Sequence, residues 1–370
     1  MRTAIILLII LCILIVGIGI AFCCIDAPKS AKTPSEALDD TNDLDTIDAV
    51  VTWVDGRSKE RYRLLDEYMQ KEQEEYPDAD ILHLKAREPD VRGPPEQDEL
   101  YFCLHLMAKF MPWLRQVHLI TQKPERPSWL SPTSNSVNGL KIQIVHHDDI
   151  FDIKGPKIPT FNSTSILTNI PNIPNLAERF ILFDDDCYVG QPLSPSHFFD
   201  VDGTPIVPVN VCNIDNFRGE PAWFRTIQHS HELIRKYLTK RSITMPEIIL
   251  APEHVCVPFL KSAFRHILYE DEDINKARCN LLRFRCNREF YTQAVIIGIL
   301  ATLGAIQTPK PDFQARMLQT DQLRYFTAET MPHVFCINHA LSETDVSILN
   351  SLVASNGLVP YAHSTMVPCA

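Results

Sequence analysis

The chain has 370 residues, of which 45% are hydrophobic and 22% are charged, an ordinary composition for a folded protein with a sizeable core. It carries 35 Lys and Arg residues against 46 Asp and Glu residues, so its formal charge is −11. A mildly acidic chain without a basic run is not expected to bind nucleic acid as its main partner. An anionic small substrate remains compatible, because it needs only a local group of positive side chains.

The first segment with a clear pattern runs from Ala4 to Ile25. It has no charged residue, is rich in Ile and Leu, and as a helix is long enough to span about 30 Å of hydrocarbon. We predict a transmembrane anchor over residues 1–25, which gives the chain a membrane as a partner. A cleaved signal peptide is the alternative, but residues 22–24 show no small-x-small cleavage site.

Residues 26–46 contain two prolines, six acidic residues and no aromatic residue, so they cannot bury enough surface to fold and are predicted to form a flexible stalk. The folded catalytic domain is then expected over residues 47–370. The eleven cysteines form no C-x-x-C pair and no zinc-type spacing, although isolated disulfides stay open in an oxidising compartment.

Apolar runs and helical periodicities alternate along this domain. Strands are predicted at 47–53, 116–121, 141–146 and 180–183, and helices at 58–76, 98–111, 230–237 and 289–303. This alternation is typical of an α/β fold, here a Rossmann-like mixed sheet flanked by helices.

The most informative stretch is the apolar run Phe180–Phe183, which ends in the three carboxylates of Asp184, Asp185 and Asp186. Carboxylates at the end of a buried strand lie at the rim of a sheet, where α/β enzymes hold metals and anionic substrates. Three adjacent acids repel one another, so a cation, hydrogen bonds or solvent must stabilise them. The alternative interpretation is a solvated strand end with acids as turn formers.

Two further segments combine polar groups with apolar neighbours. Glu253 and His254 precede an apolar run, and Arg283, Arg285 and Arg288 precede the last predicted helix. If the arginines open that helix, their guanidinium groups and its free N–H groups could converge on a phosphate. A solvated helix start that pairs with nearby acids is the alternative.

Taken together, these segments resemble the Stealth family of sugar-1-phosphate transferases. That family includes bacterial capsular polysaccharide phosphotransferases and the catalytic subunit of the lysosomal-enzyme N-acetylglucosamine-1-phosphotransferase. The matching blocks follow the family's order: Ile47–Gly56, then pieces from Asp98 through Pro159–Ser163 to Asp186, then the His254 segment, and finally Arg283–Arg285 with the later Cys336–Asn338.

The resemblance implies transfer of a hexose-1-phosphate from a UDP-sugar to a hydroxyl of a glycan or polysaccharide, with release of UMP. It implies Mg²⁺ or Mn²⁺ on Asp185 and Asp186, His254 as general base and Arg285 as a phosphate clamp, with Asp185, His254 and Arg285 as the catalytic set. The nucleotide-sugar is expected to contact Asp48, Thr52, Trp53, Asp55, Gly56, Arg92 and Arg283. Asp184, which stands where the family often has Asn, is expected to play a supporting part.

Two alternatives remain open: a metal-dependent glycosyltransferase that uses a UDP-sugar, and a non-catalytic glycan-binding protein on the same scaffold. Tyr101, His105, Leu167, Asn169 and Cys256 depart from the family's pattern, so the sugar and the acceptor stay undetermined. In a eukaryotic host, the resemblance implies a single-pass protein with its catalytic domain in the Golgi or ER lumen.

Overall fold

The computed structural model describes residues 46–56, 58–81, 99–152, 155–213, 221–319, 322–337 and 341–355. The predicted anchor, nearly all of the predicted stalk and Arg92 lie outside these ranges. Among the described residues, no helix is both long enough and apolar enough to cross a membrane.

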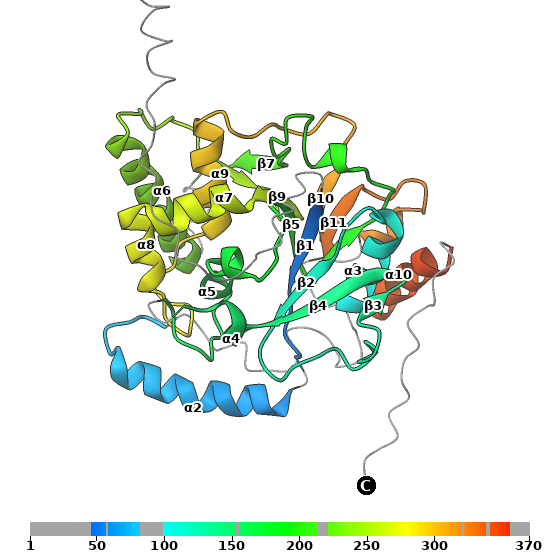
Figure 1. Cartoon of the computed structure of the whole chain (residues 1–370), viewed down its shortest axis with the longest axis horizontal. Helices are drawn as coiled ribbons and strands as arrows, with labels where there is room; N and C mark the ends of the chain where they lie inside the picture. The colour runs from blue at the N-terminus through cyan, green and yellow to red at the C-terminus, as the bar shows by residue number, and fades with distance from the viewer. Residues whose placement is uncertain are drawn as a thin grey trace, which may run out of the picture. The chain divides into compact units, whose positions relative to one another are not determined.

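A six-stranded mixed sheet lies at the centre of the fold, in the order β3-β4-β2-β1-β5-β9 (Figure 1). Its strands are β1 (Ile47–Thr52), β2 (Val117–Thr121), β3 (Ser136–Val137), β4 (Leu140–His146), β5 (Arg179–Asp184) and β9 (Val257–Leu260). Strands β1, β2, β4 and β5 are parallel, whereas β3 and β9 are antiparallel to their neighbours. The predicted mixed α/β sheet is therefore confirmed. The four parallel strands end at one edge, called here the carboxyl edge.

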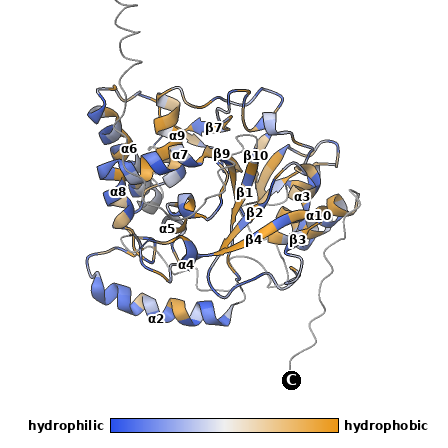
Figure 2. Cartoon of the chain, in the orientation of Figure 1, coloured by the Kyte–Doolittle hydropathy of each residue, from blue (hydrophilic) through white to orange (hydrophobic). Residues whose placement is uncertain are grey.

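Helices cover both faces of this sheet, and its central strands β1, β2 and β5 are accordingly buried along nearly their whole length. Helices α3 (Glu99–Phe110) and α10 (Glu343–Ser355) lie on one side, and α6 (Pro221–Lys240), α8 (Glu272–Cys279) and α9 (Thr292–Thr302) on the other (Figure 1). Successive residues of β5 enter different cores: Ile181 and Phe183 pack in the first, and Phe180 and Leu182 in the second. Figure 2 shows the resulting apolar strands.

A second, three-stranded sheet starts where β5 ends. It has the order β10-β11-β6, with β6 (Cys187–Val189), β10 (Ala315–Leu318) and β11 (Val334–Ile337). Asp185 and Asp186 form the whole connection between β5 and β6. Strand β11 runs antiparallel to β6 and places Cys336 opposite Cys187. The sequence analysis missed this sheet, whose strands have three or four residues each.

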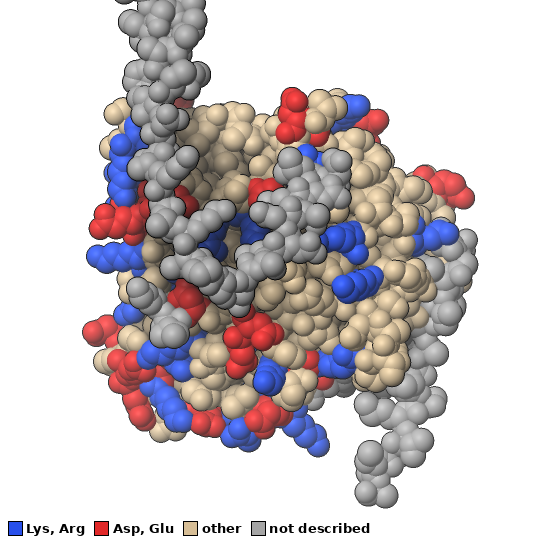
Figure 3. Space-filling model, viewed as in Figure 1, with Lys and Arg blue, Asp and Glu red and all other residues tan. Residues whose placement is uncertain are grey.

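Helix α2 (Lys59–Glu75) packs on the body of the protein mainly through polar contacts. The Ser58 side chain caps it by accepting from the Arg61 N–H, and Glu72 pairs with Arg283 at 3.2 Å. Its outer face carries a ladder of exposed ion pairs formed by Glu60, Arg63, Glu67 and Lys71. Acidic and basic side chains are accordingly interspersed over this part of the surface (Figure 3).

The remaining elements are short. They are α4 (His147–Ile150), α5 (Ser163–Leu167), the two-stranded sheet of β7 (Val209–Val211) and β8 (Leu250–Pro252), α7 (Lys261–Arg265), and the turns η2 (Ile170–Asn172), η3 (Pro195–His197), η5 (His266–Glu270) and η6 (Leu323–Tyr325).

Candidate active site

The carboxylates at the end of β5 lie at the carboxyl edge, as the sequence predicts. Asp184 is the last residue of β5 and pairs in register with Thr52, the last residue of β1. The Thr52 hydroxyl donates to Asp184 Oδ1 at 3.3 Å, which fixes the direction of that carboxylate. Asp184, Asp185 and Asp186 are all partly exposed, so a ligand can reach them.

His254 completes this acidic cluster because β9 is antiparallel to β5. Val257, the first residue of β9, pairs with Leu182, so the segment before β9 lies beside the end of β5. One ligand atom each of Asp184, Asp186 and His254 lies within 4.8 Å of the other two. Asp185 is not a member of this group. We call Asp184, Asp186 and His254 the edge cluster.

Two thiols border the edge cluster. Cys187 follows Asp186 in the chain, and its thiol donates to Asp186 Oδ1 at 3.9 Å. The Cys336 side chain is hydrogen-bonded to those of Cys187 and His254. All seven cysteines in the described part of the chain are free thiols.

The close packing of these groups shifts the pKa values of Asp186 and His254. Burial, reinforced by Cys336 and Asp184, raises the pKa of Asp186. The hydrogen bond with Cys336 raises the pKa of His254, and the Asp184 and Asp186 carboxylates add to this increase. A half-buried group of acids around one imidazole therefore stabilises positive charge.

The donor set fits a divalent cation. Carboxylate oxygens are the ligands that Mg²⁺ and Mn²⁺ prefer, and Asp184 and Asp186 offer two of them close together. The raised pKa of Asp186 means that ionising this buried carboxyl beside Cys336 and Asp184 costs free energy. A cation held by Asp184 and Asp186 would offset that cost.

Arg285 is held by a different set of contacts. Its guanidinium donates to the Ser163 hydroxyl, at the start of α5. Phe161 stacks on Phe284 with ring centroids 5.0 Å apart, and the Phe161 N–H donates to the Arg283 carbonyl at 2.7 Å. These contacts join the Pro159–Ser163 segment to the arginine segment. Arg285 itself is exposed.

The arginine segment leads back to the edge cluster through Tyr291. Burial raises the pKa of Tyr291, and the Asp184 carboxylate raises it further, so the two side chains are close enough to interact electrostatically. Helix α9 begins only at Thr292. The prediction that the arginines open this helix is therefore wrong; hydrogen bonds to α5 and α2 position Arg285 and Arg283 instead.

A group of polar side chains with unsatisfied atoms lies at the carboxyl ends of β2 and β4. Glu125 Oε2 accepts from the Asp55 N–H and the Thr121 hydroxyl, both at 3.2 Å, whereas Glu125 Oε1 has no hydrogen-bond partner among the described residues. The same holds for Gln122 Oε1 and for both ring nitrogens of the buried His147. Burial lowers the pKa of His147 to about 4. We call Gln122, Glu125 and His147 the polar cluster.

Arg61, in the first turn of α2, is close to this polar cluster. Burial raises the pKa of Glu125 and lowers that of His147, while the charge of Arg61 opposes the first change and adds to the second, so Arg61 is near enough to interact with both. Its guanidinium carbon also lies 5.4 Å from the centre of the Phe161 ring. Arg61 therefore places a cation near both the polar cluster and Phe161.

Comparison with known proteins gives this arrangement a family. The model of Stealth protein CR2, conserved region 2, matches residues 95–207. A capsular polysaccharide phosphotransferase of Neisseria meningitidis serogroup B is 30% identical over 314 residues, which cover 80% of this chain and 77% of that protein. The chain belongs to the Stealth family. The capsular polysaccharide phosphotransferase LcbA of Aeromonas hydrophila is also 30% identical, over 79% of this chain and 78% of its own length.

Among solved structures, the galactosyltransferase LgtC covers 87% of this chain and 97% of its own, at 12% identity and a TM-score of 0.39. A likeness at this level supports no conclusion about the Stealth chain.

The Stealth blocks, which are far apart in the sequence, meet in two places. Thr52, Asp186, His254 and Cys336 come from the first, second, third and last blocks, and they lie in or against the edge cluster. Ser163 and Arg285, from the second and fourth blocks, meet at α5.

Several residues expected to contact the nucleotide-sugar make contacts within the fold itself. Asp48 is fully buried in β1, and its carboxylate accepts from Arg115, His118 and the Ala177 N–H. It lies near the amino end of β1, away from the carboxyl edge. Trp53 is also a core residue, with 7% of its surface exposed.

Of the other residues expected to contact the nucleotide-sugar, one makes contacts within the fold and others lie at the carboxyl edge. Arg283 pairs with Glu72, donates to the Ile158 carbonyl at 3.2 Å and stacks on the Tyr68 ring, so it anchors α2. Asp55 and Gly56 do lie at the carboxyl edge, where Gly56 is exposed and accepts from the Tyr62 hydroxyl at 2.9 Å. Arg92 lies outside the described residues.

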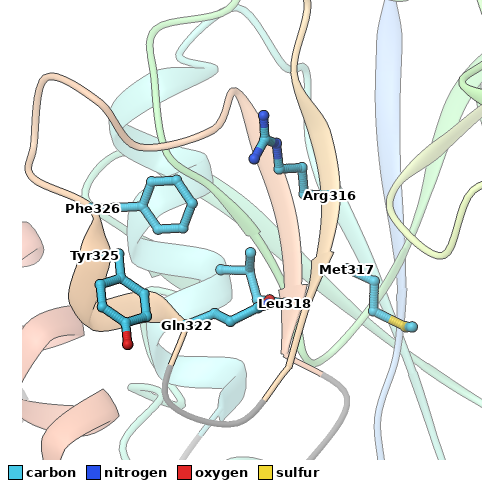
Figure 4. Close-up of a pocket in the computed structure, with 6 residues that line it drawn as sticks. All are labelled: Arg316, Met317, Leu318, Gln322, Tyr325 and Phe326. Carbon is cyan, nitrogen blue, oxygen red and sulfur yellow. The ribbon is translucent and has the colours of Figure 1, made fainter.

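The sequence did not point to Arg61, to the polar cluster, or to the position of Cys187 and Cys336 beside the edge cluster. Nothing local marks Arg61, because its helix reads as a charged, solvated segment. Cys336 does have a signal, since Cys336–Asn338 resembles a Stealth block, but the resemblance assigns it no role. A separate cavity of about 370 Å³ lies against β10 and η6 (Figure 4). It contains none of the predicted site residues and is lined by Arg316, Met317, Leu318, Gln322, Tyr325 and Phe326.

Proposed function

We propose that this Stealth protein transfers a hexose-1-phosphate from a UDP-sugar to a hydroxyl of a glycan or polysaccharide, forming a phosphodiester and releasing UMP. The observation that carries the proposal is the edge cluster, in which two carboxylates and an imidazole meet at the carboxyl edge of an α/β sheet. The names of the matched relatives, capsular polysaccharide phosphotransferases, support this reaction class.

The donor would lie along the carboxyl edge, with its nucleotide toward β2 and β4 and its sugar phosphate toward β5. A nucleobase offers the hydrogen-bond donors and acceptors that the unsatisfied atoms of Gln122, Glu125 and His147 lack. Arg61 and Arg285 would contact the diphosphate from its two sides, because charge-assisted hydrogen bonds from guanidinium groups suit phosphate oxygens.

Asp184 and Asp186 would hold the divalent cation, which supplies charge neutralisation on the diphosphate when it is bound. The sequence-based pair was Asp185 and Asp186, and we now propose Asp184 as the partner of Asp186 because of its place in the edge cluster. Thr52 would keep the Asp184 carboxylate in position through its hydrogen bond.

His254 would accept the proton of the attacking glycan hydroxyl. The imidazole of His254 must be neutral for this role. A cation on Asp184 and Asp186 would reduce their negative charge, which contributes to the raised pKa of His254, and would so lower that pKa. The hydroxyl oxygen would then form a bond to the β-phosphorus. At the same time the bond between the β-phosphorus and the bridging oxygen would break, and UMP would leave with that oxygen.

A screen of UDP-sugars for UMP release, with and without Mg²⁺ or Mn²⁺, tests this proposal. We expect metal-dependent UMP release with at least one donor when a glycan acceptor is present. Release of UDP instead would favour a glycosyltransferase that attacks the sugar carbon. No turnover of any UDP-sugar with either ion would favour a non-catalytic glycan-binding protein.

A further inference from the structure

The thiols beside the edge cluster form a second possible ligand set, which differs in chemical character from the first. One ligand atom each of Asp186, Cys187 and Cys336 lies within 4.8 Å of the other two. Asp186 therefore belongs to both groups. In the first group its neighbours are Asp184 and His254, and in the second they are two sulfur atoms.

The geometry of this second set is imposed by the fold. Cys187 and Cys336 face each other as a directly paired position of the antiparallel strands β6 and β11. The Ile337 N–H donates to the Asp186 carbonyl at 3.1 Å, which ties the end of β11 to the turn that carries Asp186. The hydrogen bond between Cys336 and His254 then brings an imidazole to the same place.

Two sulfurs, one imidazole nitrogen and one carboxylate oxygen make a tetrahedral zinc set. With Zn–S bonds of about 2.3 Å and Zn–N bonds of about 2.0 Å, the ligand atoms of such a site lie roughly 3.3–3.8 Å apart. The Cys187 Sγ to Asp186 Oδ1 distance is 3.9 Å, the ligand atoms of Asp186, Cys187 and Cys336 lie within 4.8 Å of one another, and His254 has a ligand atom within 4.8 Å of an Asp186 oxygen. Side-chain adjustments of about an ångström would therefore close the set around an ion.

We propose that Cys187, Cys336, Asp186 and His254 bind a thiophilic divalent ion, Zn²⁺, at a site that overlaps the edge cluster. Because this ion would occupy Asp186 and His254, it would compete with Mg²⁺ or Mn²⁺ and inhibit the proposed sugar-phosphate transfer. The binding itself does not rest on the proposed transferase reaction.

The test is a titration of the full chain with Cd²⁺ and Co²⁺, which report sulfur ligands through thiolate-to-metal charge-transfer absorption. We expect a band that saturates at one ion per chain and is displaced by Zn²⁺. Cys187→Ser and Cys336→Ser should each weaken the band and lower Zn²⁺ affinity by more than about tenfold, since even the outer partners of metal ligands are worth about 10–100-fold.

Cys279→Ser is the matched control, because Cys279 is a partly exposed thiol on α8 that donates to Asn275 Oδ1 at 3.6 Å. It should leave the band unchanged. A wild-type chain without a charge-transfer band at one equivalent of Cd²⁺ would overturn the proposal, whether or not the serine variants fold. So would a band that is lost in Cys279→Ser and kept in the other two variants. UMP release plays no part in either readout, so failure here leaves the proposed reaction untouched.

Discussion

Among single residues, the position of each carboxylate relative to the end of β5 determines whether it belongs to the edge cluster. Asp184 still belongs to β5 and is oriented by Thr52, whereas Asp185 and Asp186 form the link to β6. The family pattern favoured Asp185 and Asp186, and the geometry pairs Asp186 with Asp184. The two assignments lead to different mutational results.

We expect Asp184→Asn to reduce kcat by at least about 100-fold, the usual cost of removing one preorganised electrostatic group from a transition state. Asp185→Asn should reduce it by less than about tenfold. Asp202→Asn, which changes an exposed carboxylate in a turn, is the control and should have no effect. The measurement is the rate of UMP release at saturating donor. A large loss in Asp185→Asn with little loss in Asp184→Asn would restore the family-based pair.

Arg61 and Arg63 provide a matched pair on one helix. Arg61 lies near Glu125, His147 and Phe161, while Arg63 is 58% exposed and pairs only with Glu60 and Glu67 of its own helix in the described structure. We expect Arg61→Ala to raise KM for the UDP-sugar by about tenfold or more, because a hydrogen bond to a charged group is worth about 1.5–3 kcal/mol. Arg63→Ala should leave KM unchanged. Equal effects of the two substitutions would mean that Arg61 acts only through the stability of α2.

At the element scale, the strands of the main sheet could be predicted because each is an apolar run bounded by polar residues. Strands β1, β2, β4 and β5 and helix α2 all match the predicted ranges to within two residues. The three-stranded sheet could not be predicted this way, because Ala315–Leu318 shows no period and Met317 is exposed. Helix α6 starts nine residues before its prediction, at Pro221, since its amphipathic pattern is interrupted by polar residues.

Strand β1 also shows surroundings of Asp48 that the sequence does not reveal. A carboxylate near the start of the first strand matches a family block, but only the fold reveals Arg115 and His118 beside it. Burial alone would raise the pKa of Asp48, yet hydrogen bonds from His118 and Arg115 hold it below its ordinary value. The group therefore stabilises the folded state when it is ionised.

We expect Asp48→Asn to lower the free energy of unfolding by about 3 kcal/mol at neutral pH, because it removes the buried carboxylate that accepts from Arg115, His118 and the Ala177 N–H. Since the folded-state pKa is depressed, the contribution is fully present above the unfolded pKa of about 3.9 and is lost as the pH falls through the folded-state value. Urea unfolding of both proteins at several pH values checks this. A stability difference that stays constant down to the acid limit would contradict it.

At the scale of the whole molecule, the active site is a product of topology. Asp184 and Asp186 lie at the end of a parallel strand, His254 precedes an antiparallel one, and Cys336 belongs to another sheet. Sequence patterns could place the acids at a sheet edge, because strand ends are local features. They could not bring His254 or Cys336 there, since these contacts span about 70 to 150 residues and depend on strand order.

The fate of the donor's β-phosphate distinguishes the proposed phosphotransfer at the edge cluster from other reactions. The wild-type chain is incubated with a UDP-sugar labelled at the β-phosphorus, a glycan acceptor and Mg²⁺ or Mn²⁺, beside Asp184→Asn and the Asp202→Asn control. We expect the label to enter the glycan in step with UMP release, Asp202→Asn to behave like wild type, and Asp184→Asn to show neither signal. Label that remains entirely in released UDP while the sugar enters the glycan would contradict the proposed phosphotransfer.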